Sequence, residues 1–197
     1  MTKAAIIESG MTFGPYPAGR CFYIEKSCCY ARLKKGVQMA EFLLLMHQRQ
    51  GPTMWVVEAK SSSPNPEAPV PFAKYIDEIR NKLTNGFLLA VAARLQRHPA
   101  AIAELPEPFK TLDLQAQGFR FVLVINGHPT EWLAPVQNAL SLALKPVVKT
   151  WALPVTSVAV LNQELAEKHG LILPAVAAGP LSDDPRSSSA LPCLDEA

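Results

Sequence analysis

Three side chains that could act together in hydrolysis lie in two apolar stretches of the first sixty residues. Glu41 lies within the stretch 37–45, and Glu58 and Lys60 end the stretch 54–60. Because alternate residues of a strand project from the same face, Glu58 and Lys60 are expected to share a face. A carboxylate or an ammonium buried there needs a partner or a bound ligand, since its desolvation is costly. Carboxylate oxygens are hard ligands that suit Mg²⁺ or Mn²⁺.

The polar segment 47–52 connects these two stretches and contains Gly51 and Pro52. Such a segment predicts a turn between two neighbouring antiparallel strands. In that arrangement Glu41 lies beside Glu58 and Lys60. The sequence therefore predicts a small cluster of two acids and one amine.

Glu41 followed by Glu58-Ala59-Lys60 resembles the active-site pattern of the PD-(D/E)xK, or restriction-endonuclease-like, phosphodiesterases, in which an acid on one strand precedes an acid-x-lysine on the next. The resemblance implies a metal-dependent nuclease that hydrolyses phosphodiester bonds of nucleic acid, DNA rather than RNA. It implies Glu41, Glu58 and Lys60 as catalytic residues. It also implies Mg²⁺ or Mn²⁺ as the cofactor, held by the carboxylates of Glu41 and Glu58 and by the carbonyl oxygen of Ala59.

The hydrophobic periodicity predicts an α/β fold with a mixed central sheet flanked by helices. Strands are expected at 21–30, 37–46, 53–60, 119–126 and 157–161, and helices at 72–97, 132–148 and 163–169. This order is similar to the restriction-endonuclease-like core over roughly residues 20 to 170. Two departures are visible: the Gly- and Pro-rich residues 1–20 do not supply the usual opening helix, and the first acid is a Glu rather than an Asp.

Length and composition predict one globular domain over residues 1–173. The chain has 197 residues, 49% of them apolar and 18% charged, with a formal net charge of +2, which neither predicts nor excludes a nucleic-acid partner. Residues 174–197 lack a periodic apolar face and are predicted to be a disordered tail. No stretch predicts a signal peptide or a membrane span, so a cytoplasmic protein without a membrane partner is expected. The oligomeric state stays open, with a homodimer or a place in a larger system as possibilities.

Several alternatives remain open at this stage. Glu58 and Lys60 could form only a structural ion pair with Glu41 solvated, and the fold could serve as a catalytically inactive binding or assembly module. Glu25 is expected to be a solvated or ion-paired strand residue. The segment 61–71 is expected to be a loop at the mouth of the site. Basic residues on one face of the helix at 72–97 are either solvated or in contact with nucleic acid: Lys74, Arg80, Lys82, Arg94 and Arg97.

Overall fold

The computed structural model describes residues 5–33, 35–48 and 51–172. Its centre is a five-stranded mixed sheet in the order β3-β4-β5-β6-β7. The strands are β3 (Cys21–Phe22), β4 (Phe42–Gln48), β5 (Gly51–Lys60), β6 (Gly118–Ile125) and β7 (Val158–Asn162). β4 is antiparallel to β5, whereas β5, β6 and β7 are parallel to one another. The predicted mixed sheet and the antiparallel pairing of the two acid-bearing segments are therefore confirmed.

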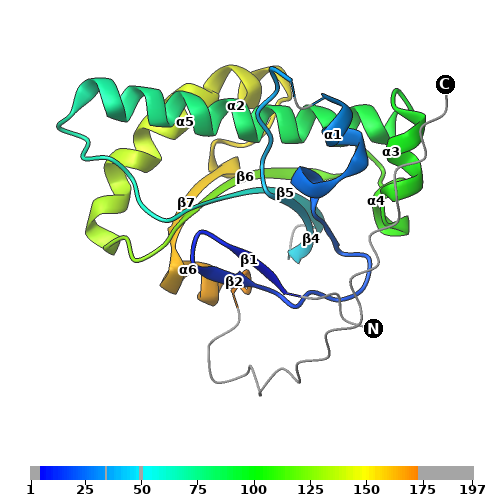
Figure 1. Ribbon diagram of the computed structural model, residues 1–197, viewed down its shortest axis with the longest axis horizontal. Coiled ribbons are helices and arrows are strands. Elements are labelled where there is room, and N and C mark those ends of the chain that lie inside the picture. Colours follow the sequence, from blue (N-terminus) through cyan, green and yellow to red (C-terminus); the bar gives the residue numbers. More distant parts are fainter. Residues whose placement is uncertain (1–4, 34, 49–50, 173–197) are drawn as a thin grey trace.

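Helices cover one face of this sheet and a small hairpin covers the other (Figure 1). α2 (Pro69–Arg94) and α5 (Leu133–Thr150) provide the crossovers between the parallel strands. The opposite face carries the antiparallel pair β1 (Ile6–Glu8) and β2 (Met11–Phe13), with α6 (Gln163–Lys168) beside it. The inner strands are thus covered on both faces, which explains why β6 reads as a nearly continuous apolar run.

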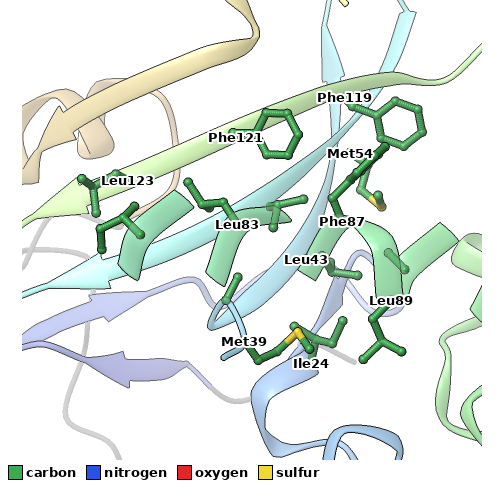
Figure 2. Close-up of a cluster of buried hydrophobic side chains, with 14 of the residues drawn as sticks. Ile24, Met39, Leu43, Met54, Leu83, Phe87, Leu89, Phe119, Phe121 and Leu123 are labelled. Carbon is green, nitrogen blue, oxygen red and sulfur yellow. The ribbon is translucent and has the colours of Figure 1, made fainter. Parts of the chain in front are cut away.

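The larger core fills the space between the sheet and α2 (Figure 2). Phe87 of α2 lies at its centre and contacts Phe119 and Phe121 edge to face, with ring centroids 5.0 and 5.6 Å away. Immediately before Phe87, Gly86 faces the sheet so closely that an added Cβ would lie 3.0 Å from side-chain atoms of Ala40 and Val56. The absence of a side chain at Gly86 therefore lets α2 approach β5 closely. The helix continues through this glycine without a break.

The predicted strand at 21–30 is wrong beyond its first two residues. After β3 the chain forms a 3-10 turn, η1 (Ile24–Lys26), and then the helix α1 (Cys28–Leu33). The Oγ of Ser27 accepts a hydrogen bond from the main-chain N–H of Tyr30 at 3.0 Å, as a helix N-cap does. The carboxylate of Glu104 accepts two more, from the N–H groups of Cys28 and Cys29 at 2.7 and 3.0 Å. Glu104, which is distant in the sequence, therefore caps the N-terminus of α1. The helix was not predicted because residues 21–30 are rich in types that favour strands.

Other boundaries also differ from the prediction. Within the Gly- and Pro-rich residues 1–20, for which no strand was predicted, Met11–Phe13 pairs with β1. The proline-interrupted segment 99–117 contains two short helices, α3 (Pro99–Glu104) and α4 (Glu107–Lys110). α5 continues through Pro146. Two further 3-10 turns, η2 (Thr130–Trp132) and η3 (Val155–Ser157), precede α5 and β7.

Among the described residues, no helix has the length and apolar character needed to traverse a bilayer. The tail predicted at 174–197 lies outside the described residues. The same holds for residues 49 and 50 in the predicted turn.

Candidate functional site

Glu41 and Glu58 lie side by side on the α2 face of the sheet. The register pairs Phe42 with Val57, and the main-chain N–H of Glu41 donates to the carbonyl oxygen of Val57 at 3.0 Å. Glu41 therefore precedes β4 instead of lying in the middle of a strand, as the sequence had indicated. Both acids are enclosed, with 6% of Glu41 and 0% of Glu58 exposed. The alternative in which Glu41 is solvated is excluded by this burial.

A lysine from α2 joins the two carboxylates. The Nζ of Lys82 donates to Oε1 of Glu58 at 2.8 Å and lies 3.7 Å from Oε1 of Glu41. Its side chain is 16% exposed, so these attractions operate largely away from bulk water. Lys82 is thus a buried counter-ion shared by two acids, and it is not part of a solvated helix face.

Lys60 occupies the solvent side of the same cluster. Its Nζ lies 3.4 Å from Oε1 of Glu58 and donates to Oε1 of Glu78, on α2, at 2.7 Å. The Lys60 side chain is 23% exposed and that of Glu78 is 36% exposed. The cluster therefore has an enclosed end at Glu58 and a more accessible end at Lys60.

Burial dominates the protonation of the two acids. Desolvation raises the pKa of Glu41 to about 8, and the neighbouring carboxylates of Glu58 and Glu25 raise it in the same direction. Desolvation likewise raises the pKa of Glu58 to about 7, although Lys82 and Lys60 oppose the shift. Burial disfavours the charged form of Lys82, but the attractions to Glu58, Glu41 and Glu25 together outweigh it and raise the pKa of that amine. The acids thus resist ionisation at neutral pH unless further positive charge is present.

Several buried oxygen atoms at this site lack a hydrogen-bond partner among the residues that the structure describes. They are Oε2 of Glu41, Oε2 of Glu58 and the hydroxyl oxygen of Tyr75, which lies close enough to Glu58 for that carboxylate to raise its pKa. Orphaned buried oxygens are rare in native proteins and usually indicate water or an ion. Because the donors are all hard oxygen atoms, the residues fit a divalent cation such as Mg²⁺. The side chain of Ala59 belongs to the core on the opposite face, and its carbonyl stays a predicted ligand.

Two neighbouring acids extend the cluster beyond the predicted set. An oxygen of Glu41 lies with oxygens of Glu8 and Glu25 in a group whose members are all within 4.8 Å of one another. Glu25 had been expected on a strand, whereas it lies in η1 and its N–H donates to the carbonyl oxygen of Glu41 at 3.2 Å. Glu8 was missed because its approach depends on the fold of β1 and β2 against the sheet.

The importance of Lys82 was also missed, although the sequence contains a signal for it. Tyr75, Ile79, Lys82 and Gly86 follow one another at spacings of four, three and four residues, which places them on one helix face. Ile79 is fully buried and Gly86 contacts the sheet. A lysine on the same face as these residues must therefore point toward the strands, where its charge needs an acid.

A hollow of about 790 Å³ lies at the carboxyl edge of the parallel strands. The segments 61–67 and 126–129 line it, together with Trp132, whose exposed fraction is 60%. The N–H of Asn126 donates to the carbonyl oxygen of Lys60 at 2.9 Å, which joins one wall of the hollow to the cluster. Ligands of open α/β sheets commonly bind outside this edge.

Comparison with known proteins gives no match: no family model, no curated protein and no solved structure is similar to this chain at a significant level.

Proposed function

We propose that this chain is a metal-dependent nuclease of restriction-endonuclease-like fold, which hydrolyses phosphodiester bonds of nucleic acid, DNA in preference to RNA. The observation that carries the proposal is the enclosure of Glu41 and Glu58 next to each other, each with an oxygen to which no group of the described residues hydrogen-bonds. Two buried carboxylates repel each other and so favour the arrival of a cation. The order of strands and helices, with Lys60 two residues after Glu58, supports the same proposal.

In the proposed site, Glu41, Glu58 and the carbonyl of Ala59 hold Mg²⁺ or Mn²⁺. The bound cation supplies a Lewis acid for the phosphate and lowers the pKa of a ligated water. Lys60 is the accessible amine, and it positions the attacking water or stabilises charge on the phosphate. Lys82 lies on the enclosed side, where it keeps the two acids oriented. Hydrolysis forms a bond between water oxygen and phosphorus, breaks the bond from phosphorus to the leaving sugar oxygen, and transfers one proton from water through solvent to that leaving oxygen.

A cleavage assay on single- and double-stranded DNA and RNA tests the proposal, with Mg²⁺ or Mn²⁺ present or chelated. We expect metal-dependent cleavage by the unaltered chain and its loss in Glu41→Gln, Glu58→Gln and Lys60→Ala. Lys60→Ala is expected to retain the cation, whereas Glu58→Gln is not, as calorimetry would show. Glu107→Gln and Lys149→Ala are matched controls on exposed residues that do not line the hollow. Absence of cleavage of every substrate, or full activity in Glu58→Gln, contradicts the proposal.

A second candidate is a nuclease-like fold without turnover that acts as a binding or assembly module. The observation that favours it is the close pairing of Glu58 with Lys82 at 2.8 Å and with Lys60 at 3.4 Å, which partly neutralises the acid without a metal. On this reading the cluster fixes the position of α2 on the sheet. Binding of nucleic acid without cleavage, unaffected by chelation of divalent cations, would support the module over the enzyme.

A further inference from the structure

Three carboxylates from three separate segments meet on the hairpin side of Glu41. Glu8 ends β1, Glu25 lies in η1 and Glu41 precedes β4, and an oxygen from each lies within 4.8 Å of the other two. The turn after β1 places Ser9 and Gly10 at φ values of 52° and 75°, so the hairpin reverses direction directly after Glu8. The fold therefore brings together like charges that are 33 residues apart along the chain.

The described cations near this group do not balance its charge. Lys26 lies 3.7 Å from Glu25, but its side chain is 64% exposed, so solvent weakens the attraction. Lys82 lies 3.7 Å from Glu41 and is closer to Glu58, at 2.8 Å. The hydroxyl of Tyr23 donates a hydrogen bond to Glu8, which adds a dipole but no charge. Among the described residues, the three carboxylates are thus offset only by the exposed ammonium of Lys26 and by that of Lys82, which also pairs with Glu58.

One member of the group is enclosed and incompletely bound. Glu41 is 6% exposed, its Oε1 faces Lys82, and its Oε2 has no hydrogen-bond partner within 5–33, 35–48 and 51–172. A buried carboxylate oxygen without a partner is costly, so its retention points to a ligand other than the protein. The nearest candidates for the same ligand are the oxygens of Glu8 and Glu25, which lie on the accessible side of the group.

We propose that Glu8, Glu25 and Glu41 form a second site for a hard divalent cation, which shares Glu41 with the site assigned to Glu41, Glu58 and Ala59. This inference does not depend on nuclease activity, because Glu8 and Glu25 lie outside the proposed catalytic set. The donors are oxygen atoms only, which selects Mg²⁺, Mn²⁺ or Ca²⁺ over softer metals. A point equidistant from three oxygens at this spacing lies at most about 2.8 Å from each, so small side-chain rotations reach the 2.1–2.6 Å typical of such cations.

The site also has a structural consequence. A cation there links β1 to η1 and to the start of β4, so it fastens the hairpin to the edge of the sheet that bears Glu41. Its occupancy would decrease the repulsion among the three acids. Stability of the hairpin and affinity for the cation are thereby coupled.

Calorimetric titration of Mn²⁺ into the full chain tests the second site. Glu8→Gln and Glu25→Gln are each expected to weaken one Mn²⁺-binding event by about tenfold or more, because each removes one anionic ligand. Glu58→Gln removes no ligand of this group, so the event is expected to persist in that variant, even if cleavage is abolished. Glu107→Gln, at an exposed acid that belongs neither to this group nor to the lining of the hollow, is the control. Unchanged Mn²⁺ binding in both Glu8→Gln and Glu25→Gln, or no binding at millimolar Mn²⁺, overturns the inference.

A measurement on the unaltered chain covers the case in which these variants do not fold. Paramagnetic broadening of backbone amide signals by substoichiometric Mn²⁺ is expected to be greatest at Glu8, Glu25 and Glu41. Broadening centred on Lys60 and the segment 61–67, with sharp signals at Glu8 and Glu25, would show that the cation binds only elsewhere and would contradict the second site. Because this readout requires no nucleic acid, it distinguishes failure of the second site from failure of the nuclease proposal.

Discussion

Glu58 is fully buried and lies within ion-pair distance of Lys60 and Lys82. Burial raises the pKa of Glu58 and the two lysines lower it, so the balance between them determines how the stability of the fold depends on pH. Burial raises the pKa of Glu58 from 4.5 to about 7, and that of Glu41 to about 8. The folded state therefore binds these protons more tightly than the unfolded state does. By linkage, their contribution to the free energy of unfolding is greatest near pH 4.5 and is lost as pH rises toward 8.

Replacing Glu58 by Gln is expected to remove the contribution of Glu58 to the pH dependence of the free energy of unfolding. In the presence of a chelator, the melting temperature of Glu58→Gln relative to the unaltered chain should rise between pH 5 and pH 8.5, by on the order of 5 °C. Thermal melts at several pH values measure this difference, which cancels the effect of groups that titrate in both proteins. A relative melting temperature that falls with pH would show that the ionised form of Glu58 is the one the fold favours.

Lys82 is expected to stabilise the fold most strongly where both acids are ionised. Lys82→Met should lower the free energy of unfolding at pH 8 by about 3 kcal/mol, because it leaves Glu41 and Glu58 without their shared counter-ion. At pH 5.5 the loss should be smaller, since the acids can take up protons. Urea denaturation at the two pH values measures it.

Lys74→Met is the matched control for this substitution, because Lys74 is exposed on the same helix. Its effect should stay within about 0.5 kcal/mol at either pH. Equal losses for Lys82→Met at pH 5.5 and pH 8 would show that the lysine acts through packing of its aliphatic chain instead of its charge.

At the scale of elements, the contact between α2 and β5 determines whether Lys82 reaches the acids. Gly86 lies one turn after Lys82, and a Cβ at this position meets Ala40 and Val56 at 3.0 Å. In an exposed helix, a Gly→Ala change is stabilising by about 1 kcal/mol. Here the close approach of helix and sheet opposes that gain.

We expect Gly86→Val to lower the free energy of unfolding by about 2 kcal/mol through overpacking. It should also strengthen Mn²⁺ binding, because a displaced α2 moves the competing positive charge of Lys82 away from Glu41 and Glu58. Denaturation and calorimetry measure the two effects. Leu88→Val, on an exposed part of the same helix, is the control. A variant as stable as the unaltered chain would mean that α2 shifts without cost.

The segment 61–68 joins β5 to α2 and lines the hollow beside Lys60. Its main chain forms local turn contacts, including the N–H of Ala68 to the carbonyl oxygen of Asn65 at 3.0 Å. β6, by contrast, is bonded to a strand on each side. Amide hydrogen exchange in 61–68 is therefore expected to be at least about a hundredfold faster than in β6. Equal protection in both segments would contradict a loop that admits ligands.

The elements that the sequence predicted well are those whose apolar pattern is local. β5, β6, β7 and the two long helices follow from runs of branched residues and from 3.6-residue periodicity, and their ends differ from the predicted ones by only a few residues. The pairing of Glu41 with Glu58 followed from a short connection between two apolar stretches. These features required no knowledge of distant contacts.

The features that the sequence did not reveal depend on distant contacts. α1 begins where Glu104 binds the N–H groups of Cys28 and Cys29, from a segment more than seventy residues away. Glu8 approaches Glu25 only because β1 and β2 pack on the sheet. Lys82 was assigned to the polar helix face because a lysine is usually solvated. For Glu104 and Glu8, a charged side chain acts across a distance along the chain that periodicity does not encode, whereas the spacing within α2 does place Lys82 on the face toward the sheet.

At the scale of the whole molecule, two hydrophobic cores share one sheet. Within β5, Met54 and Val56 belong to the core beneath α2, whereas Trp55 and Val57 belong to the core beneath the hairpin. Loss of either layer exposes apolar side chains of the same strands to water, which costs about 25 cal/mol for each Å². The two layers are therefore expected to unfold together.

Tryptophan fluorescence offers a separate probe for each layer. Trp55 is buried on the hairpin face, whereas Trp151 packs against Phe87 on the helix face with ring centroids 4.7 Å apart. In a variant that keeps only Trp55, the urea midpoint from fluorescence should equal that from far-UV circular dichroism. The same should hold in a variant that keeps only Trp151. If the midpoint from Trp55 alone precedes that from circular dichroism, the hairpin layer separates first, and Glu8 would leave Glu25 and Glu41 before the sheet unfolds.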